Sequence, residues 1–250
     1  VIDDFAKGGV NGVHGLLTGD INRDGTLDLI GNSAQPNGSF PNSLAWWDGK
    51  TFERHIFAKN DAPGLSHYFG FGDVNGDGRG DIAVGAKIEP DGNYFAWWEQ
   101  PGDAAKPWTK HVINAQQPGA TNIAIVDVNK DGKMDFLATR GHGRGLVWFE
   151  APNWTPHSIN DTIIGPHALA TGDIDKDGDI DAVTCAKDSL LAAWFENDGK
   201  GGFTTHPIYE VQSCYDIRLV DIDKDGKLDV LVAGRETGDV VWYRNQLKGK

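Results

Sequence analysis

The chain has 250 residues and a formal net charge of −13, with 39% hydrophobic and 24% charged residues. This length can bury a sizeable core, and no stretch approaches the roughly 20 apolar residues of a transmembrane helix. The acidity and the lack of a Lys/Arg-rich run argue against nucleic acid and membrane partners, because both surfaces would repel the chain. The 33 Gly and 9 Trp beside a single Met favour short strands and tight turns over helices.

One nine-residue motif recurs five times along the chain. The copies are DINRDGTLD at 20–28, DVNGDGRGD at 73–81, DVNKDGKMD at 127–135, DIDKDGDID at 173–181 and DIDKDGKLD at 221–229. Successive copies are 53, 54, 46 and 48 residues apart. An apolar segment precedes each copy and a β-branched segment follows it, so we expect a strand on each side.

Two further elements recur in phase with the motif. A Trp strand follows each copy and contains Trp46, Trp97, Trp148, Trp194 or Trp242. A fourth segment follows in four repeats and contains His55, His111, His157 or His206. Repetition in register predicts packing between repeats for the Trp residues and a structural strand role for these His residues.

Four antiparallel strands per repeat at this period predict an all-β fold, a five-bladed β-propeller in a single domain over residues 1–250. The motif would form the loop between the first and second strands of each blade. The fifth repeat ends after its Trp strand, whereas the N-terminal VIDDF aligns with the fourth strands HVINA and HSIND. We therefore expect the N-terminal strand to complete the last blade and close the ring. The alternatives are a fragment of a larger propeller and a laterally paired assembly.

The motif supplies hard oxygen ligands at fixed positions. Side-chain oxygens stand at positions 1, 3, 5 and 9, a backbone carbonyl is available at 7, and Gly at 6 permits a sharp turn. The seventeen Asp side chains at these four positions would repel one another without a cation. We therefore predict about five structural Ca²⁺ ions, which would bring the charge from −13 to about −3.

The predicted calcium ligands occupy positions 1, 3, 5, 7 and 9 of the five copies: Asp20, Asn22, Asp24, Thr26, Asp28, Asp73, Asn75, Asp77, Arg79, Asp81, Asp127, Asn129, Asp131, Lys133, Asp135, Asp173, Asp175, Asp177, Asp179, Asp181, Asp221, Asp223, Asp225, Lys227 and Asp229. An EF-hand is excluded, because position 12 carries strand residues in place of Glu: Gly31, Val84, Ala138, Thr184 and Val232. The alternative to a metal site is an Asx-rich hairpin turn.

These nonapeptides, preceded by segments such as FGFGDVNGDG, resemble FG-GAP/VCBS repeats, the calcium-binding propeller blades of integrin α-subunits, fungal lectins and several carbohydrate-active enzymes. The resemblance covers essentially the whole chain. The accompanying W-[WFY]-E and H-x-I segments are similar to the propeller part of aldos-2-ulose dehydratase and related sugar lyases, whose propellers have more blades and whose chains carry further domains. The resemblance implies a calcium-stabilised propeller and leaves the activity open.

Polar residues that differ between repeats are the candidates for function. Six residues before each motif stand His14, His67, Thr121, His167 and Tyr215, which should surround the propeller axis opposite the calcium loops. Asn122 and the loops between second and third strands add polar side chains and cations to the same mouth. We predict one central site with catalytic His14, His67, His167 and Tyr215, and with substrate-binding Lys87, Asn122, Arg140, His142, Lys187 and Arg235.

Several chemistries fit this central site. His14, His67 and His167 would suit Zn²⁺ or another transition metal. Alternatively, a His and Tyr215 would serve as base and acid in a β-elimination on a uronate-containing or keto-sugar, with a cation neutralising the carboxylate. The carboxylate pair of a glycoside hydrolase is not evident. We rank a carbohydrate lyase or dehydratase first, a calcium-dependent lectin second and an integrin-like protein-binding scaffold third.

The two cysteines lie in adjacent repeats, Cys185 at the end of a second strand and Cys214 at the start of a first strand. Both a disulfide and free thiols stay open at this point. Weak calcium sites fill at the roughly millimolar concentrations found outside cells. We therefore expect a secreted or periplasmic protein in its mature form after signal removal, monomeric and with a carbohydrate partner.

Overall fold

The computed structural model describes residues 2, 8–10, 12–33, 38–63, 65–87, 93–209 and 213–247, with only the backbone described at 65–67. The chain divides into two compact units, Val1–Ile125 and Val126–Lys250, called here the N-terminal and C-terminal units. Every described residue is in a strand, a turn or an irregular segment. Within these ranges no helix is long and apolar enough to cross a membrane.

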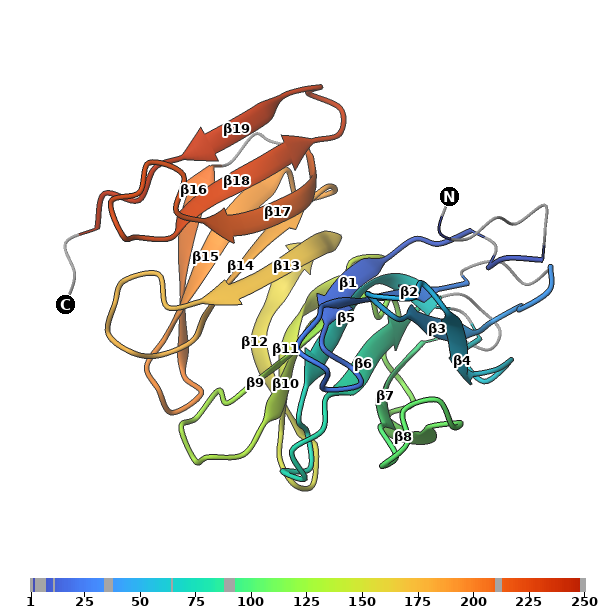
Figure 1. Ribbon diagram of the computed structural model, residues 1–250. Helices are drawn as coiled ribbons and strands as arrows, with labels where there is room; N and C mark the ends of the chain where they lie inside the picture. The colour runs from blue at the N-terminus through green and yellow to red at the C-terminus, as the bar shows by residue number, and fades with distance from the viewer. Residues whose placement is uncertain are drawn as a thin grey trace. The chain divides into compact units, whose positions relative to one another are not determined.

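The N-terminal unit contains two four-stranded antiparallel sheets (Figure 1). Blade one has the strands β1 (Leu16–Gly19), β2 (Asp28–Asn32), β3 (Leu44–Trp47) and β4 (Arg54–Ala58). Blade two has β5 (Leu65–Gly72), β6 (Asp81–Ala86), β7 (Tyr94–Glu99) and β8 (Thr109–Asn114). Neighbours in sequence are neighbours in each sheet, so every connection within a blade is a hairpin.

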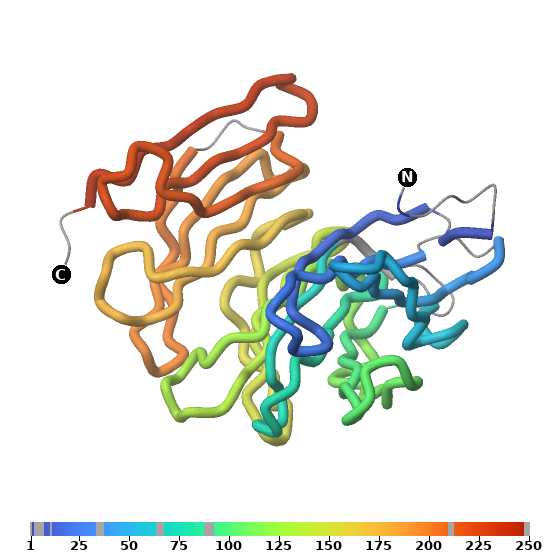
Figure 2. The backbone as a smooth tube through the Cα atoms, in the orientation of Figure 1, coloured from blue at the N-terminus to red at the C-terminus, as the bar shows by residue number. Residues whose placement is uncertain are grey.

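The remaining three sheets follow the same order (Figure 2). Blade three has β9 (Asn122–Val126), in which the boundary between the units falls, then β10 (Asp135–Thr139), β11 (Arg144–Glu150) and β12 (Thr155–Ile164). Blade four has β13 (Pro166–Gly172), β14 (Asp181–Ala186), β15 (Leu191–Asn197) and β16 (Phe203–Tyr209). Blade five has β17 (Cys214–Val220), β18 (Asp229–Gly234) and β19 (Val240–Tyr243).

The predicted architecture is confirmed: the fold is an all-β propeller with blades of four, four, four, four and three described strands. Each nine-residue motif lies between the first and second strands of its blade. The segment VIDDF, expected to complete blade five, lies outside the described residues apart from Ile2. The single domain over residues 1–250 stays a prediction.

Each Trp of the repeated strand packs in the same way in blades one to four. Its ring stacks on the His of the adjacent fourth strand, with centroids 4.2 Å apart for Trp46 and His55 and 4.4 Å apart for Trp148 and His157. The pairs Trp97–His111 and Trp194–His206 repeat the arrangement. These four Trp side chains are at most 9% exposed, whereas Trp242 in the three-stranded blade is 43% exposed. This agrees with the packing role expected for both residue types.

In blades two and three the stacked imidazole contacts the Glu that ends the Trp strand. His111 Nε2 lies 2.9 Å from Glu99 Oε2, and His157 Nε2 lies 2.8 Å from Glu150 Oε2. The other oxygen, Glu150 Oε1, accepts a hydrogen bond from Asn129 Nδ2 at position 3 of the blade-three motif. This chain of contacts connects the motif loop to the outermost strand of its blade.

An amide side chain also joins neighbouring blades within each unit. Gln100 Nε2 donates to the carbonyl of Ile21 at 2.9 Å, Asn197 Nδ2 to that of Val128 at 2.8 Å, and Asn245 Nδ2 to that of Ile174 at 2.8 Å. Each acceptor is position 2 of the motif in the preceding blade. The loops are therefore fixed from the next blade as well as from their own, which satisfies carbonyls that burial would otherwise leave without a partner.

The difference between the two kinds of Trp gives a test of the packing. Trp148→Ala should lower the free energy of unfolding by roughly 3–5 kcal/mol, because a buried ring is lost and its site cannot collapse fully. Trp242→Ala should cost much less, since that ring is already 43% exposed. Urea unfolding of the two variants measures both values, and equal losses would contradict the described packing.

Candidate functional site

Each motif folds into a loop whose acidic side chains are held by backbone N–H groups. In blade one the N–H of Asp24, at position 5, donates to Asp20 Oδ1 at 3.0 Å and to Asn22 Oδ1 at 3.1 Å. The N–H of Gly25 donates to Asp20 Oδ2 and that of Thr26 to Asp24 Oδ1. Blades two, three and five repeat all four bonds. The side-chain oxygens at positions 1, 3 and 5 thus face the same turn.

Glycine at position 6 is required by the backbone. Its φ lies between +83° and +88° in all five motifs, a region that other L-residues seldom adopt. At Gly25 and Gly132 an added Cβ would meet no atom within 4 Å, so the requirement is conformational and not steric. The sharp turn that the sequence predicted at this position is present.

Position 9 has a role that sequence reasoning missed. Its carboxylate is at most 1% exposed in every motif: Asp28, Asp81, Asp135, Asp181 and Asp229. One oxygen accepts the N–H of position 2 and the other accepts an N–H at the end of the Trp strand or just beyond it, as Asp81 does from Val74 and Gln100 at 2.9 Å each. The same pair of bonds occurs in the other four blades. Position 9 therefore clamps the loop to the third strand, a role that its spacing did not reveal, and its metal ligation stays a prediction.

The motif of blade four gathers the most negative charge. Asp173, Asp175 and Asp177 each offer an oxygen, and the three oxygens lie within 4.8 Å of one another. Asp221, Asp223 and Asp225 of blade five form a second such group. In the blade-four loop Asp173 Oδ1 is buried and accepts no hydrogen bond, whereas position 1 of every other motif accepts one at this atom. A buried carboxylate oxygen in this state fits a hard cation.

Cationic side chains partly neutralise several loops. Lys50 Nζ lies 2.8 Å from Asp24 Oδ2, and its hydrogen bond lowers the pKa of Asp24 despite the opposing effect of desolvation. Lys133 lowers the pKa of Asp131 in the same way. Arg244 Nε lies 2.6 Å from Asp223 Oδ2. These ion pairs are at the surface, where solvent screening leaves each of them only a small effect on stability.

Burial acts in the opposite direction on the pKa of three of the clamping carboxylates, Asp81, Asp135 and Asp181. Desolvation raises the pKa of Asp81 and of Asp181 to about 6, although each accepts two backbone hydrogen bonds that favour the ionised form. Desolvation also raises the pKa of Asp135. Neighbouring motif carboxylates add to the rise, since Asp77 and Asp73 repel the charge on Asp81.

The residues predicted for the central site fall into both units. In the N-terminal unit His14 is exposed just before β1, Lys87 is half-buried after β6, and Asn122 is buried at the start of β9. Thr121, beside Asn122, is buried and donates its hydroxyl to the carbonyl of Gly119. The His67 side chain lies outside the described residues, so the metal triad His14, His67 and His167 stays a prediction.

In the C-terminal unit four of the predicted residues form a continuous run of contacts. The rings of His142 and His167 meet edge to face, with centroids 5.2 Å apart, and His167 stacks on Tyr215 at 3.7 Å. The Arg235 guanidinium lies 5.3 Å from the centroid of the Tyr215 ring. Three blades supply the four side chains. We call this run, together with Lys187, the His167–Tyr215 site.

His167 and Tyr215 each lie at an irregularity in the strand pairing. The register between β13 and β14 shifts between Pro166 and Ala168, which makes His167 the extra residue. The register between β17 and β18 shifts in the same way between Cys214 and Asp216, at Tyr215. A bulge adds one residue to a strand and redirects its side chain. Sequence alignment of the repeats placed these residues at equivalent positions but carried no signal for the bulges.

A hydrogen bond fixes which ring nitrogen of His167 carries a proton. Its Nδ1 lies 3.0 Å from the backbone carbonyl oxygen of Tyr215, which can only accept, so Nδ1 carries a proton. In the neutral ring Nε2 is then the basic nitrogen. His167 is 0% exposed, whereas Tyr215 is half-buried and His142 is exposed. Tyr215 and His142 are therefore the rings of the run that face solvent, beside the exposed Arg235 side chain.

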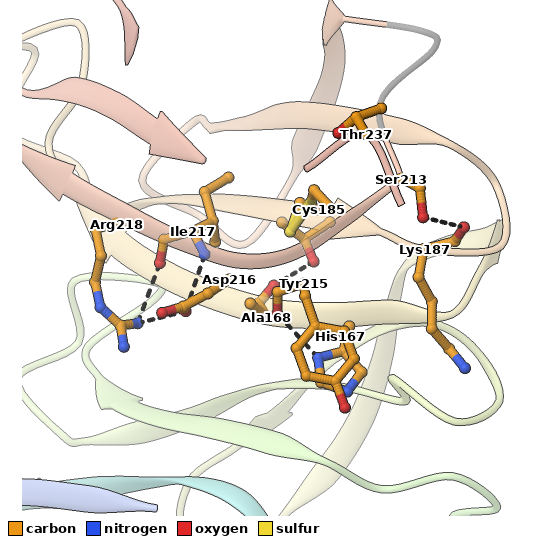
Figure 3. The surroundings of a disulfide bond; sticks show 12 residues. His167, Ala168, Cys185, Lys187, Ser213, Tyr215, Asp216, Ile217, Arg218 and Thr237 are labelled. Atoms are coloured by element: carbon orange, nitrogen blue, oxygen red, sulfur yellow. Dashed lines mark hydrogen bonds and ion pairs between the residues drawn. A yellow bond between two sulfur atoms is a disulfide. The ribbon is translucent and has the colours of Figure 1, made fainter. Parts of the chain in front are cut away.

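The remaining cations differ in how they are held. The Lys187 ammonium is 3.7 Å from Asp188, and the Ser213 hydroxyl lies 3.5 Å from the Lys187 carbonyl oxygen, so this residue is joined to blade five (Figure 3). Arg140 donates to the carbonyl of Arg144 within its own loop at 3.3 Å. Asp216, an acid at the same end of the blade, pairs with Arg218 at 3.0 Å.

Comparison with known proteins agrees with this architecture. A family model described as an FG-GAP-like repeat matches residues 20–84, 73–138 and 173–232. No curated protein matches the sequence at a significant level. Among 187 matching chains of solved structures is a luciferin-regenerating enzyme, 10% identical, with a TM-score of 0.60 over 98% of this chain and 76% of that one. At that identity the likeness shows the fold alone.

The raised carboxyl pKa values predict an unusual pH dependence for the metal-free protein. Because the pKa of Asp81 and Asp181 is about 6 in the fold and about 3.9 in the unfolded chain, their protonation favours the fold. This contribution is complete below about pH 4 and is lost as the pH rises through 6. Lowering the pH from 7 to 5 should therefore stabilise the protein, by on the order of 1 kcal/mol per carboxyl.

The measurement is the melting temperature in metal-free buffers between pH 7 and 5. Asp24 and Asp131 have lowered pKa values, so their ionised forms stabilise the fold. This contribution is lost only near and below pH 4, outside the measured range. The variant Asp81→Asn/Asp181→Asn should lose most of the slope. A melting temperature that falls from pH 7 to 5, or a slope unchanged in the variant, would contradict the assignment.

Proposed function

Because the chain belongs to the FG-GAP-like repeat family, we propose that its motif loops bind Ca²⁺ and that the His167–Tyr215 site acts on a sugar substrate. The proposed reaction is β-elimination on a uronate-containing or keto-sugar. The observation that carries the proposal is the run of contacts from His142 through His167 and Tyr215 to Arg235. It combines proton-transferring groups with a cation, which is the combination this reaction needs.

Calcium is the cation that best suits the loops. The donors at positions 1, 3, 5 and 9 are carboxylate and amide oxygens, which Ca²⁺ prefers over the softer ligands of transition metals. Asp173 Oδ1, buried without a hydrogen bond, supports a ligand in blade four. Bound Ca²⁺ would supply positive charge to the crowded carboxylates and so stabilise the fold.

The residues of the C-terminal unit have distinct proposed roles. Arg235 and Lys187, whose backbones both contact Ser213, would pair with the carboxylate of a uronate, which makes the neighbouring C–H bond more acidic. His142 and Tyr215 face solvent and are the proton-transferring groups able to touch the sugar. His167 is fully buried and would hold Tyr215 in position through ring stacking and its bond to the Tyr215 carbonyl.

The proposed step balances within these groups. Either His142 or Tyr215 removes the proton from the carbon next to the carboxylate. The C–O bond on the adjacent carbon breaks as a carbon–carbon double bond forms, and the other residue donates a proton to the leaving oxygen. The product double bond is conjugated with the carboxylate and therefore absorbs in the ultraviolet.

Glycan binding without turnover is the second candidate. The half-exposed Tyr215 ring, supported from below by His167, is a flat platform of the kind that sugars pack against. The mouth residues differ from blade to blade, which favours one site over the several equivalent sites expected of a multivalent lectin.

We also propose that the protein works in a calcium-rich, oxidising setting, secreted or periplasmic. The disulfide between Cys185 and Cys214 supports this, because such bonds persist mainly outside the reducing cytosol. Weak calcium sites would be filled there at roughly millimolar concentrations.

Calcium removal should destabilise the fold strongly. Each site filled at about 100 times its Kd would contribute about 2.7 kcal/mol, so chelation should lower the melting temperature by roughly 5 °C or more. Asp177→Ala removes a proposed ligand and should reproduce part of this loss. Lys176→Ala changes the neighbouring exposed side chain and serves as the control. A melting temperature indifferent to chelator, or equal effects of the two variants, would contradict the loop assignment.

Turnover should depend on Tyr215 and on the cation beside it. In a screen of uronate polysaccharides and keto-sugars, Tyr215→Phe should reduce the appearance of ultraviolet absorbance by about 10²-fold, the usual effect of losing an acid or base. Tyr209→Phe, at an exposed tyrosine in β16, should leave it unchanged. Arg235→Ala should weaken acidic substrates more than neutral ones. Saturable binding without new absorbance would replace the lyase by a lectin.

A further inference from the structure

A disulfide between Cys185 and Cys214 joins blades four and five beside the His167–Tyr215 site (Figure 3). Cys185 lies near the end of β14 and Cys214 begins β17, with their Cα atoms 5.6 Å apart. Both residues are 0% exposed. Figure 2 shows the strands of blade five, in red, running beside the orange strands of blade four. The bond therefore crosses the seam between two blades from which the site is built.

Two residues of the site lie close to the cysteines in the sequence. Tyr215 is the next residue after Cys214, and Lys187 is two residues after Cys185. Ser213, just before Cys214, accepts the N–H of Arg235 at its carbonyl at 2.7 Å. The Ser213 hydroxyl contacts the Lys187 carbonyl. Three side chains of the site thus depend on backbone that the disulfide holds.

A fourth of the five side chains of the site, His167, is connected to the same disulfide through the neighbouring strand β13. Its neighbour Ala168 pairs with Cys185 in the β13–β14 register. The hydroxyl of Thr184, next to Cys185, donates to the Ala168 carbonyl at 2.5 Å. His167 and Tyr215 are both bulge residues, so the regular strand ladder does not fix either of them by itself.

We propose that the Cys185–Cys214 disulfide is a positioning element of the His167–Tyr215 site. It holds the start of β17 against the end of β14, and so keeps the Tyr215 carbonyl on His167 Nδ1 and the Tyr215 ring on the imidazole. The catalytic consequence rests on the proposed function, whereas the effect on His167 geometry does not. A displacement of about 1 Å can cost 10²-fold in rate, even when the displaced group keeps its chemistry.

The structure offers a matched control for this proposal. Asn245 also joins blades four and five, by donating to the Ile174 carbonyl at 2.8 Å. Ile174 belongs to the motif that follows β13, whereas His167 stands at the start of β13, so the two connections lie at opposite ends of the same strand. Asn245→Ala and Cys185→Ala/Cys214→Ala both weaken the same seam. Only the second should disturb the site.

The first measurement is the tautomer of His167 by ¹⁵N nuclear magnetic resonance, with the signal assigned by its loss in His167→Gln. The wild type and Asn245→Ala should show one Nδ1-protonated tautomer. Cys185→Ala/Cys214→Ala should show the averaged tautomers of an unrestrained imidazole. A single Nδ1-protonated tautomer retained in the folded, disulfide-free variant would overturn the proposal, whether or not any sugar is turned over.

The second measurement is turnover of the best uronate substrate by the same proteins. The disulfide-free variant should lose about 10-fold or more in kcat/KM, with kcat itself reduced, because Tyr215, Lys187 and Arg235 all depend on backbone that the disulfide holds. Asn245→Ala should keep the wild-type kcat, and an equal loss in both variants would overturn the positioning role. Absence of turnover in the wild type would refute the proposed function and leave the tautomer result intact.

Should the disulfide-free variant fail to fold, the calcium-loaded wild type can be reduced with dithiothreitol. Reduction adds one hydrogen to each sulfur while the reagent closes to its cyclic disulfide, and alkylation of two thiols confirms it. Reduced, folded protein should show the same averaged His167 tautomers. If it keeps the Nδ1-protonated form, the proposal is wrong.

Discussion

Crowding of carboxylate oxygens at one end of every blade is the constraint on which the rest of the structure depends. Each blade reverses direction through nine residues that carry three to five acidic side chains. Backbone N–H groups turn the oxygens at positions 1, 3 and 5 inward, and the buried position 9 clamps the turn to the third strand. Surface cations offset only part of this charge. The arrangement is thus favourable for a bound cation and costly without one.

The first strand of a blade has a motif loop at its end and, in blades four and five, a residue of the candidate site at or near its start. The motif loops follow the ends of the first strands, whereas His167 and Tyr215 stand at or near the starts of β13 and β17. The motif loops are nearly identical in every blade, because each copy holds a similar group of carboxylates close together. The opposite end varies, and there bulges and a disulfide give individual residues positions that the repeat does not specify. Scaffold and candidate site can therefore change independently of each other.

Much of the fold could be predicted from the repeat itself. The motif spacing, the Trp strand and the fourth segment predicted four strands per blade, and the position of Trp148 in its strand predicted burial. These features are local and periodic, so each copy reports on the others. The clamp at Asp81 was not distinguished from ligation, because both roles require an acid at position 9.

The candidate site could be predicted only in outline. Alignment put His167 and Tyr215 at equivalent positions, but their stacking depends on two bulges that leave no signature in the residue types. Burial likewise separates His167, which faces the protein, from His142, which faces solvent, although both are histidines in polar surroundings. Sequence spacing alone could not decide whether Cys185 and Cys214 form a disulfide. The bond requires Cα atoms within about 7 Å, which depends on the placement of β14 beside β17.

The most direct test of the central claim is the calcium content of the folded chain. Equilibrium dialysis against about 1 mM CaCl₂ followed by elemental analysis gives the number of ions bound per molecule, independently of any activity. Calcium binding by the motif loops requires about five ions, one for each loop, and at least three. Fewer than three calcium ions on a folded chain would contradict it, because the carboxylates would then be held together by the protein alone.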